Sequence, residues 1–193
     1  MSTTTSHYSG PERRAYKSKP FDGDERRQAL QPQARGMESR AKFLGHPLHQ
    51  QLVMFPLGLL ATAVVFDLIY LAGGSATMGV VSFWMIVAGL IGGALATPFG
   101  LIDWLHIPEG TRAKRVGMVH GIGNVVVMTL FLLSVLLRIN DAAQPPMSAL
   151  LLSIAGGALA LLTGWMGGEL VSRLGIGVSP QAGPDASSSL RKH

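Results

Sequence analysis

Seven polar side chains in this sequence combine residue type and spacing in a way that could support chemistry. They are His46, His49, His106, His120, Asp103, Asn124 and Glu169. Imidazole and carboxylate groups can bind a metal ion or relay protons, and two imidazoles can hold a haem. A plainer role is also open, in which the histidines anchor helix ends and Asp103 or Glu169 pairs with Arg112 or Arg173.

Four long apolar stretches must position these side chains. They cover residues 51–72, 79–102, 116–137 and 147–170. A helix of about 20 residues crosses a hydrocarbon core about 30 Å thick, and inside lipid a spanning helix satisfies its own backbone hydrogen bonds. The sequence therefore predicts an all-α, integral membrane four-helix bundle over residues 44–178.

The basic residues indicate the orientation of the four spans. Of the 16 Lys and Arg residues, nine precede the first span, three lie in the second loop and three follow the fourth span. The first loop has none and the third has only Arg138. The positive-inside rule then places both termini and the second loop in the cytoplasm. Contact with the lipid bilayer explains the net charge of +5, and no nucleic-acid partner is expected.

On this topology, the polar candidates gather at the cytoplasmic boundary. His46 and His49 open the first span, Asp103 and His106 close the second, His120 and Asn124 enter the third, and Glu169 ends the fourth. Polar groups within a membrane are costly and often functional, so we expect a cytoplasmic-side polar cluster. Asp67, near the outer end of the first span, is the exception and is expected to meet water.

The two halves of the apolar region resemble each other. Residues 92–96 (GGALA) recur as residues 156–160, Gly100 then matches Gly164, and His49 falls opposite His120. This pattern indicates two repeated helical hairpins, with small residues that let the helices approach closely. Chance similarity between glycine-rich membrane helices is the alternative.

The segments outside the spans are expected to be loose. Residues 1–43 combine prolines with mixed charges and are predicted to form a disordered cytoplasmic tail, and residues 179–193 a flexible cytoplasmic one. The chain has no cysteine, which excludes disulfides, cysteine-ligated zinc, iron–sulfur clusters held by this chain alone and covalently attached haem.

Several motifs resemble those of a bacterial membrane family catalogued as domain of unknown function 2231. The opening motif is Gly45-His46-Pro47-Leu48-His49 with Val53, Phe55, Pro56, Leu57 and Gly58. Later motifs are Asp103-Trp104 with Ile107-Pro108, His120 with Asn124, Gly167 to Val171, and Gly175 to Val178. Leu174 is a departure, since members often carry a histidine just before the closing Gly-x-Gly.

The resemblance implies a four-helix domain without assigned activity, in the bacterial cytoplasmic (inner) membrane, and in a family sometimes joined to Rieske iron–sulfur domains. Three hypotheses about the function remain open. The first is a structural or accessory membrane subunit with no cofactor. The second is a b-type haem or metal-binding electron-transfer protein, with haem b between His49 and His120 or a metal among the four histidines, and a redox partner such as a Rieske-type protein. The third is a small transport or proton-relay protein.

The protein is not expected to be an enzyme. The sequence contains no pairing of a nucleophile with a base and no phosphate-binding loop.

Overall fold

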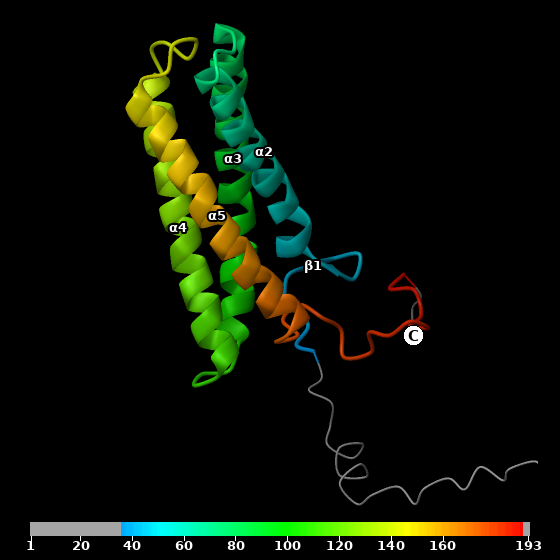
Figure 1. Cartoon of the computed structure of the whole chain (residues 1–193). Coiled ribbons are helices and arrows are strands. Elements are labelled where there is room, and N and C mark those ends of the chain that lie inside the picture. Colours follow the sequence, from blue (N-terminus) through cyan, green and yellow to red (C-terminus); the bar gives the residue numbers. More distant parts are fainter. Residues whose placement is uncertain (1–35, 191–193) are drawn as a thin grey trace, which may run out of the picture. The chain divides into compact units, whose positions relative to one another are not determined.

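Four long helices dominate the computed structural model, which describes residues 36–190 (Figure 1). They are α2 (Leu48–Leu71), α3 (Ala76–His106), α4 (Arg112–Arg138) and α5 (Met147–Ser172). All four are long and apolar enough to cross a membrane, which confirms the predicted all-α, four-span architecture. Two short strands, β1 (Lys42–Phe43) and β2 (His46–Pro47), pair in antiparallel fashion just before α2.

The helix boundaries follow from proline and capping residues. Pro47 immediately precedes α2 and Pro146 immediately precedes α5, where a missing backbone N–H costs nothing. α3 ends just before Ile107, whose extended conformation suits a residue that precedes a proline. α4 begins after Thr111, whose Oγ1 accepts a hydrogen bond from the Lys114 N–H at 3.1 Å.

The alternating helices give the described part of the chain two ends. At one end α2 begins, α3 ends, α4 begins and α5 ends, and we call this the terminal end. At the other, the far end, residues 72–75 connect α2 to α3 and residues 139–146 connect α4 to α5.

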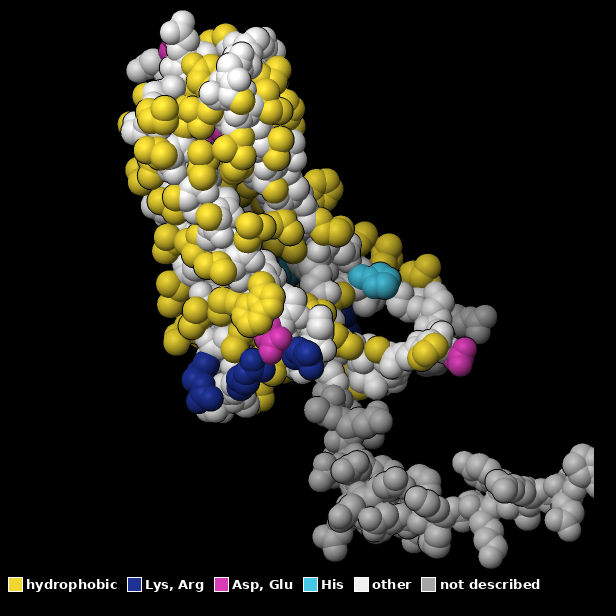
Figure 2. Space-filling view, in the orientation of Figure 1, with side chains coloured by type: hydrophobic (Ala, Val, Ile, Leu, Met, Phe, Trp, Pro, Cys, Tyr) yellow, Lys and Arg dark blue, Asp and Glu magenta, His cyan; other side chains and the backbone are white. Residues whose placement is uncertain are grey.

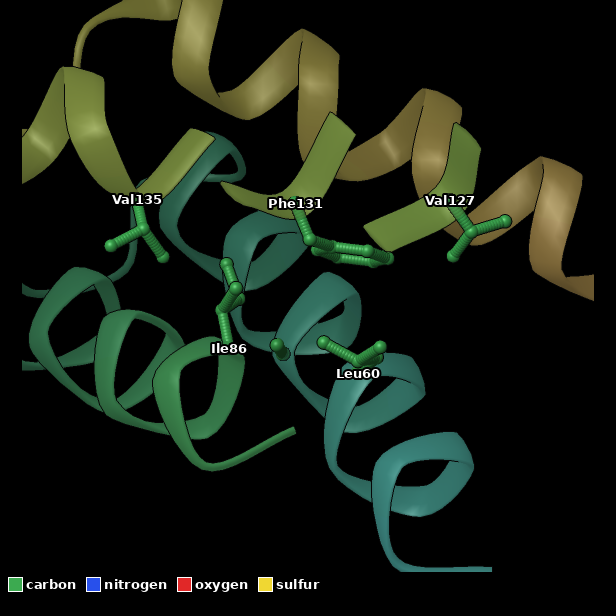
Figure 3. Packing of buried hydrophobic residues seen from close by; sticks show 6 residues of the cluster. Leu60, Ile86, Val127, Phe131 and Val135 are labelled. Atoms are coloured by element: carbon green, nitrogen blue, oxygen red, sulfur yellow. The ribbon is translucent and has the colours of Figure 1, made fainter. Parts of the chain in front are cut away.

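The helices pack as two pairs, α2 with α3 and α4 with α5. Between the pairs lies a buried cluster of Leu60, Ala63, Ile86, Val127, Phe131 and Val135, five of which are labelled in Figure 3. Close approach within each pair depends on a glycine. Leu60 of α2 lies over Gly89 of α3, and Phe131 of α4 lies over Gly156 of α5.

The outer surface of the helices is apolar. Many large hydrophobic side chains on all four helices are exposed, and Figure 2 shows them covering the visible face. A soluble protein would bury such a surface, whereas lipid contacts it at no cost. Lys and Arg side chains gather near the terminal end in the same view.

The segment just before residue 44, the predicted start of the membrane domain, is hydrogen-bonded to later parts of the chain. The Met37 N–H donates to the Gly175 carbonyl at 2.8 Å, and the Gly177 N–H donates to the Met37 carbonyl at 2.7 Å. Ser39 is buried. Residues 36–43, assigned to the disordered tail from their composition, are therefore tied to the segment that follows α5. Residues 1–35 of that tail lie outside the described residues.

Candidate functional site

His49 of α2 is fixed by a backbone carbonyl of the neighbouring helix. Its Nδ1 lies 3.0 Å from the Ala96 carbonyl oxygen on α3. Because a carbonyl oxygen can only accept a hydrogen bond, Nδ1 carries the proton, and in the neutral ring the lone pair is on Nε2. Among residues 36–190 this Nε2 has no hydrogen-bond partner. Gly100 makes room for the ring, since a Cβ there would lie 2.7 Å from His49 Cε1.

His120 of α4 has the same arrangement on the other helix pair. Its Nδ1 lies 2.9 Å from the Thr163 carbonyl oxygen on α5, so Nδ1 is again the protonated nitrogen. Gly167 faces this ring, and a Cβ there would lie 3.2 Å from His120 Cε1. Unlike His49, His120 has a second partner, because Asn124 Nδ2 lies 3.1 Å from its Nε2.

These contacts define which residues of the two helix pairs are equivalent. His120 follows His49 by 71 residues, and Phe131 follows Leu60 by the same number. Their partners Thr163, Gly167 and Gly156 follow Ala96, Gly100 and Gly89 by 67 residues in every case. The two predicted hairpins are therefore present as helix pairs with matching contacts.

The matching contacts also correct the predicted alignment of the repeat. The GGALA similarity aligned residue 92 with residue 156 and Gly100 with Gly164. In the structure Gly156 corresponds to Gly89, and Gly100 corresponds to Gly167. The difference of three residues is almost one helical turn, and such a shift keeps small residues on the same face. The pairing of His49 with His120 as counterparts is unaffected.

The two carboxylates at the terminal end have different partners. Asp103 Oδ1 accepts hydrogen bonds from Ser39 Oγ at 2.8 Å and from the Arg40 N–H at 2.9 Å. Glu169 forms an ion pair with Arg112, with Oε1 and Nη2 2.7 Å apart. The Glu169–Arg112 pair is one of the packing contacts considered from the sequence. Asp103 instead holds the segment that precedes α2.

The other two histidines stand apart from this arrangement. His46 is exposed on β2, and His106 is exposed at the end of α3 with its Nδ1 2.7 Å from the Ile102 carbonyl of its own helix. Within residues 36–190, no group of three or more His, Asp or Glu side chains is arranged to hold a metal ion. A metal site built from all four histidines remains a prediction without geometric support.

A second polar cluster, at the far end, was not predicted. Asp67 of α2 and Arg138 of α4 are both 0% exposed and form a two-pronged ion pair, with Oδ1–Nη1 2.9 Å and Oδ2–Nη2 3.1 Å. Residues of all four helices complete it. Arg138 donates to Ser82 Oγ, Ser134 Oγ and the Ala149 carbonyl, and Ser153 Oγ donates to Asp67. The expectation that Asp67 meets water is therefore wrong, because Arg138 neutralises it inside the bundle.

One sequence signal could have revealed this pair. Asp67 and Arg138 are 71 residues apart, the same separation as His49 and His120. They are therefore equivalent positions on α2 and α4, at matching depth in the predicted membrane, with opposite charges. A lone acid and a lone base at equivalent depth in two spans are candidates for an ion pair, because each alone would be an unpaired charge in lipid.

Comparison with known families agrees with the resemblance noted from the motifs. A family model described as a predicted membrane protein, domain of unknown function 2231 (DUF2231), matches residues 45–180. The chain belongs to this family. No curated protein and no solved structure matches the chain significantly. The family description assigns no activity, so the function must be argued from the two polar clusters.

Proposed function

We propose that this DUF2231 protein is an accessory membrane subunit, whose polar groups at the terminal end hold its helices and chain ends in a fixed arrangement. One observation carries the proposal: four of the polar groups at this end each link two different elements of the same chain. His49 bonds α2 to α3, His120 bonds α4 to α5, Glu169 bonds α5 to α4, and Asp103 bonds α3 to the segment before β1.

The energetics favour such a packing role. Lipid offers helices no hydrophobic driving force to associate, so hydrogen bonds and close packing between helices contribute more of the specificity. An unpartnered imidazole or carboxylate in an apolar environment costs several kcal/mol, whereas one bonded to a neighbouring helix does not. A layer of bonded polar groups therefore specifies one packing arrangement without needing a ligand.

The proposed location follows from charge. We infer that the terminal end faces the cytoplasm across the bacterial inner membrane, because the Lys and Arg residues concentrate in the segments that meet there. Arg112, Arg115 and Arg173 are exposed at this end, where they can contact anionic headgroups. Arg138, the exception at the far end, is neutralised by Asp67.

A specific observation supports a second candidate, a b-type haem or metal-binding electron-transfer protein. Histidines that bind metals usually donate their other ring N–H to a carboxylate or a backbone carbonyl. His49 and His120 both do so through Nδ1, which leaves Nε2 as the ligating atom in each neutral ring. The two residues also occupy equivalent positions on the two helix pairs.

The fit to a cofactor is incomplete on the His120 side. Asn124 already donates to Nε2 of His120, so this amide would have to turn away before that nitrogen could ligate. When bound, haem would supply one-electron transfer, and His49 and His120 would hold its iron. An electron-transfer role would also require a redox partner, such as a Rieske-type protein.

Absorption spectra and metal analysis of the purified protein separate the two candidates. The variants are His49→Ala and His120→Ala, and His106→Ala is the matched control because His106 is exposed and bonds only within its own helix. An accessory subunit should show no Soret band and no stoichiometric metal, and the first two variants should lower its thermal stability while the control does not. If the protein shows a Soret band or bound metal, and His49→Ala and His120→Ala each abolish it, the accessory-subunit proposal is wrong and the second candidate is favoured.

A further inference from the structure

An apolar β-turn projects from the chain just before the first membrane helix. β1 and β2 pair through Lys42 with Pro47 and Phe43 with His46, and Leu44 and Gly45 form the turn. Phe43 is 59% exposed and Leu44 is 61% exposed. Figure 1 shows this β-hairpin extending away from the helices beside the start of α2. Two large apolar side chains are thus presented at its tip.

The backbone at the tip makes leucine an unfavourable choice. Leu44 has φ 51° and Gly45 has φ 85°, so both lie in the left-handed region. Two-residue turns of this kind favour Asn followed by Gly, because Asn and Gly tolerate positive φ. In water an asparagine at position 44 would relieve the strain and also remove an exposed apolar side chain. Leucine there is better explained by a local environment that is not water.

The tip lies close to the start of α2, the first helix that is long and apolar enough to span a membrane. Only Gly45, His46 and Pro47 separate Leu44 from Leu48, the first residue of α2, and four steps of about 3.3 Å limit this distance to roughly 13 Å. The first turns of α2 already present Met54 and Phe55 as exposed apolar side chains. The apolar side chains of the tip therefore precede the first exposed apolar side chains of α2 by about ten residues.

The C-terminal segment adds to the same surface. Ser189 Oγ donates a hydrogen bond to the Leu44 carbonyl at 3.1 Å, and the adjacent Leu190 is 69% exposed. In sequence, Arg191 and Lys192 follow Leu190, and Lys42 precedes Phe43. Lys42 forms an exposed ion pair with Glu38 at 2.7 Å, and its hydrogen bond keeps the pKa of Glu38 below the ordinary value.

We propose that Phe43, Leu44 and Leu190, together called the apolar tip, insert into the lipid interface at the terminal end. Apolar side chains flanked by basic residues suit the boundary between headgroups and acyl chains, where the apolar groups enter lipid and the cations remain among the phosphates. The tip would then fasten both chain ends to the membrane, through β1–β2 and through the Ser189 contact. This role is independent of whether His49 and His120 bind a cofactor.

The natural absence of cysteine permits a direct test in the full-length chain. Spin labels are placed on single-cysteine variants Phe43→Cys and Leu44→Cys, reconstituted in vesicles of phosphatidylcholine and phosphatidylglycerol. Val65→Cys, on an exposed lipid-facing position of α2, and Ser187→Cys, in the exposed C-terminal segment, provide the two reference environments. Collisions with oxygen report lipid, and collisions with a water-soluble nickel chelate report water.

Labels at positions 43 and 44 should resemble the label at position 65, with frequent oxygen collisions and few nickel collisions. Nickel access equal to that at position 187 would overturn the proposal. Low access to both probes would also overturn it, because that result indicates a second copy or another protein covering the tip.

The Leu44→Asn substitution separates insertion from folding. It removes the apolar side chain and relieves the positive-φ strain, so the thermal stability in detergent should stay equal or rise. The label at position 43 should nevertheless become several-fold more accessible to nickel in vesicles. Unchanged accessibility in the Leu44→Asn background would show that Leu44 does not hold the tip in lipid.

Discussion

At the scale of single residues, the buried ion pair between Asp67 and Arg138 has the most marked energetic consequences. Charges inside a membrane protein are costly, and pairing with full hydrogen bonding offsets most of that cost. The two-pronged geometry is the strongest form of this pair. One buried atom, Arg138 Nε, has no partner among the described residues, so the cluster is not completely satisfied.

We predict that Asp67→Asn destabilises the bundle by about 3–5 kcal/mol, because it leaves the Arg138 charge buried without a counter-charge. Adding Arg138→Gln should recover part of this loss. Unfolding free energies in mixed micelles, arranged as a double-mutant cycle, measure the coupling. Glu109→Gln is the matched control, since the Glu109 side chain that pairs with the largely buried Lys114 is 85% exposed, and a pair screened by solvent in this way is worth about 0–1 kcal/mol. Additive effects of the two buried substitutions would contradict a coupled pair.

The residues of both polar clusters were visible in the sequence, but most of their partners were not. Spacing placed His49, His120, Asp103 and Glu169 at one membrane boundary. The Nδ1 hydrogen bonds of both histidines go to backbone carbonyls, which every residue has, so residue types could not identify Ala96 or Thr163. Asp67 was assigned to water because its partner, Arg138, had been counted as an ordinary loop charge.

At the scale of elements, the two helix pairs depend on glycines at their closest contacts. Gly89 accommodates Leu60 and Gly156 accommodates Phe131. The number and approximate positions of the helices could be predicted because long apolar runs leave few alternatives in lipid. The alignment of the repeat could not, because glycines spaced three or four residues apart fit more than one alignment on the same helix face.

We predict that Gly156→Ala destabilises the α4–α5 pair by about 1–3 kcal/mol, the usual cost of overpacking. The added Cβ would lie 2.9 Å from the ring of Phe131, which is fully buried and has no free direction to move. Thermal unfolding in detergent is the measurement. Gly164→Ala is the control on the same helix, since nothing lies within 4 Å of its added Cβ. Equal effects of the two substitutions would show that the Phe131 contact does not matter.

The contact between the N-terminal segment and the residues after α5 gives a further prediction. Gly177 has φ 77°, and a Cβ there would collide with the Gln50 side chain, so Gly177→Ala should release Met37 from its pairing. Trypsin should then cleave after Arg40 and Lys42 faster than in the unaltered protein. Gly183→Ala is the control, because an added Cβ at Gly183 meets no atom within 4 Å. Unaltered cleavage in Gly177→Ala would mean that this pairing does not hold the segment.

At the scale of the whole molecule, the described chain has one polar, basic end and apolar sides. The terminal end carries the polar groups that are hydrogen-bonded between elements. At the far end, Arg138 is the only Arg or Lys among the described residues, and it is buried in an ion pair. The composition of the loops already predicted this asymmetry. The reason for the asymmetry could be seen only in the folded structure, because the packing of Arg138 leaves no free charge on the surface of the far end.

The four-span bundle and its orientation are tested most directly by labelling single cysteines in the naturally cysteine-free chain, using a membrane-impermeant maleimide on intact cells. Glu109→Cys and Ser187→Cys report the terminal end, and Ser75→Cys and Gln144→Cys report the far end, all at exposed positions. If the terminal end faces the cytoplasm, positions 75 and 144 will be labelled on intact cells, and positions 109 and 187 only after permeabilisation. Labelling of positions 109 and 187 on intact cells, with positions 75 and 144 labelled only after permeabilisation, would contradict the inferred orientation. Labelling that separates 109 from 187, or 75 from 144, would contradict the four-span bundle itself.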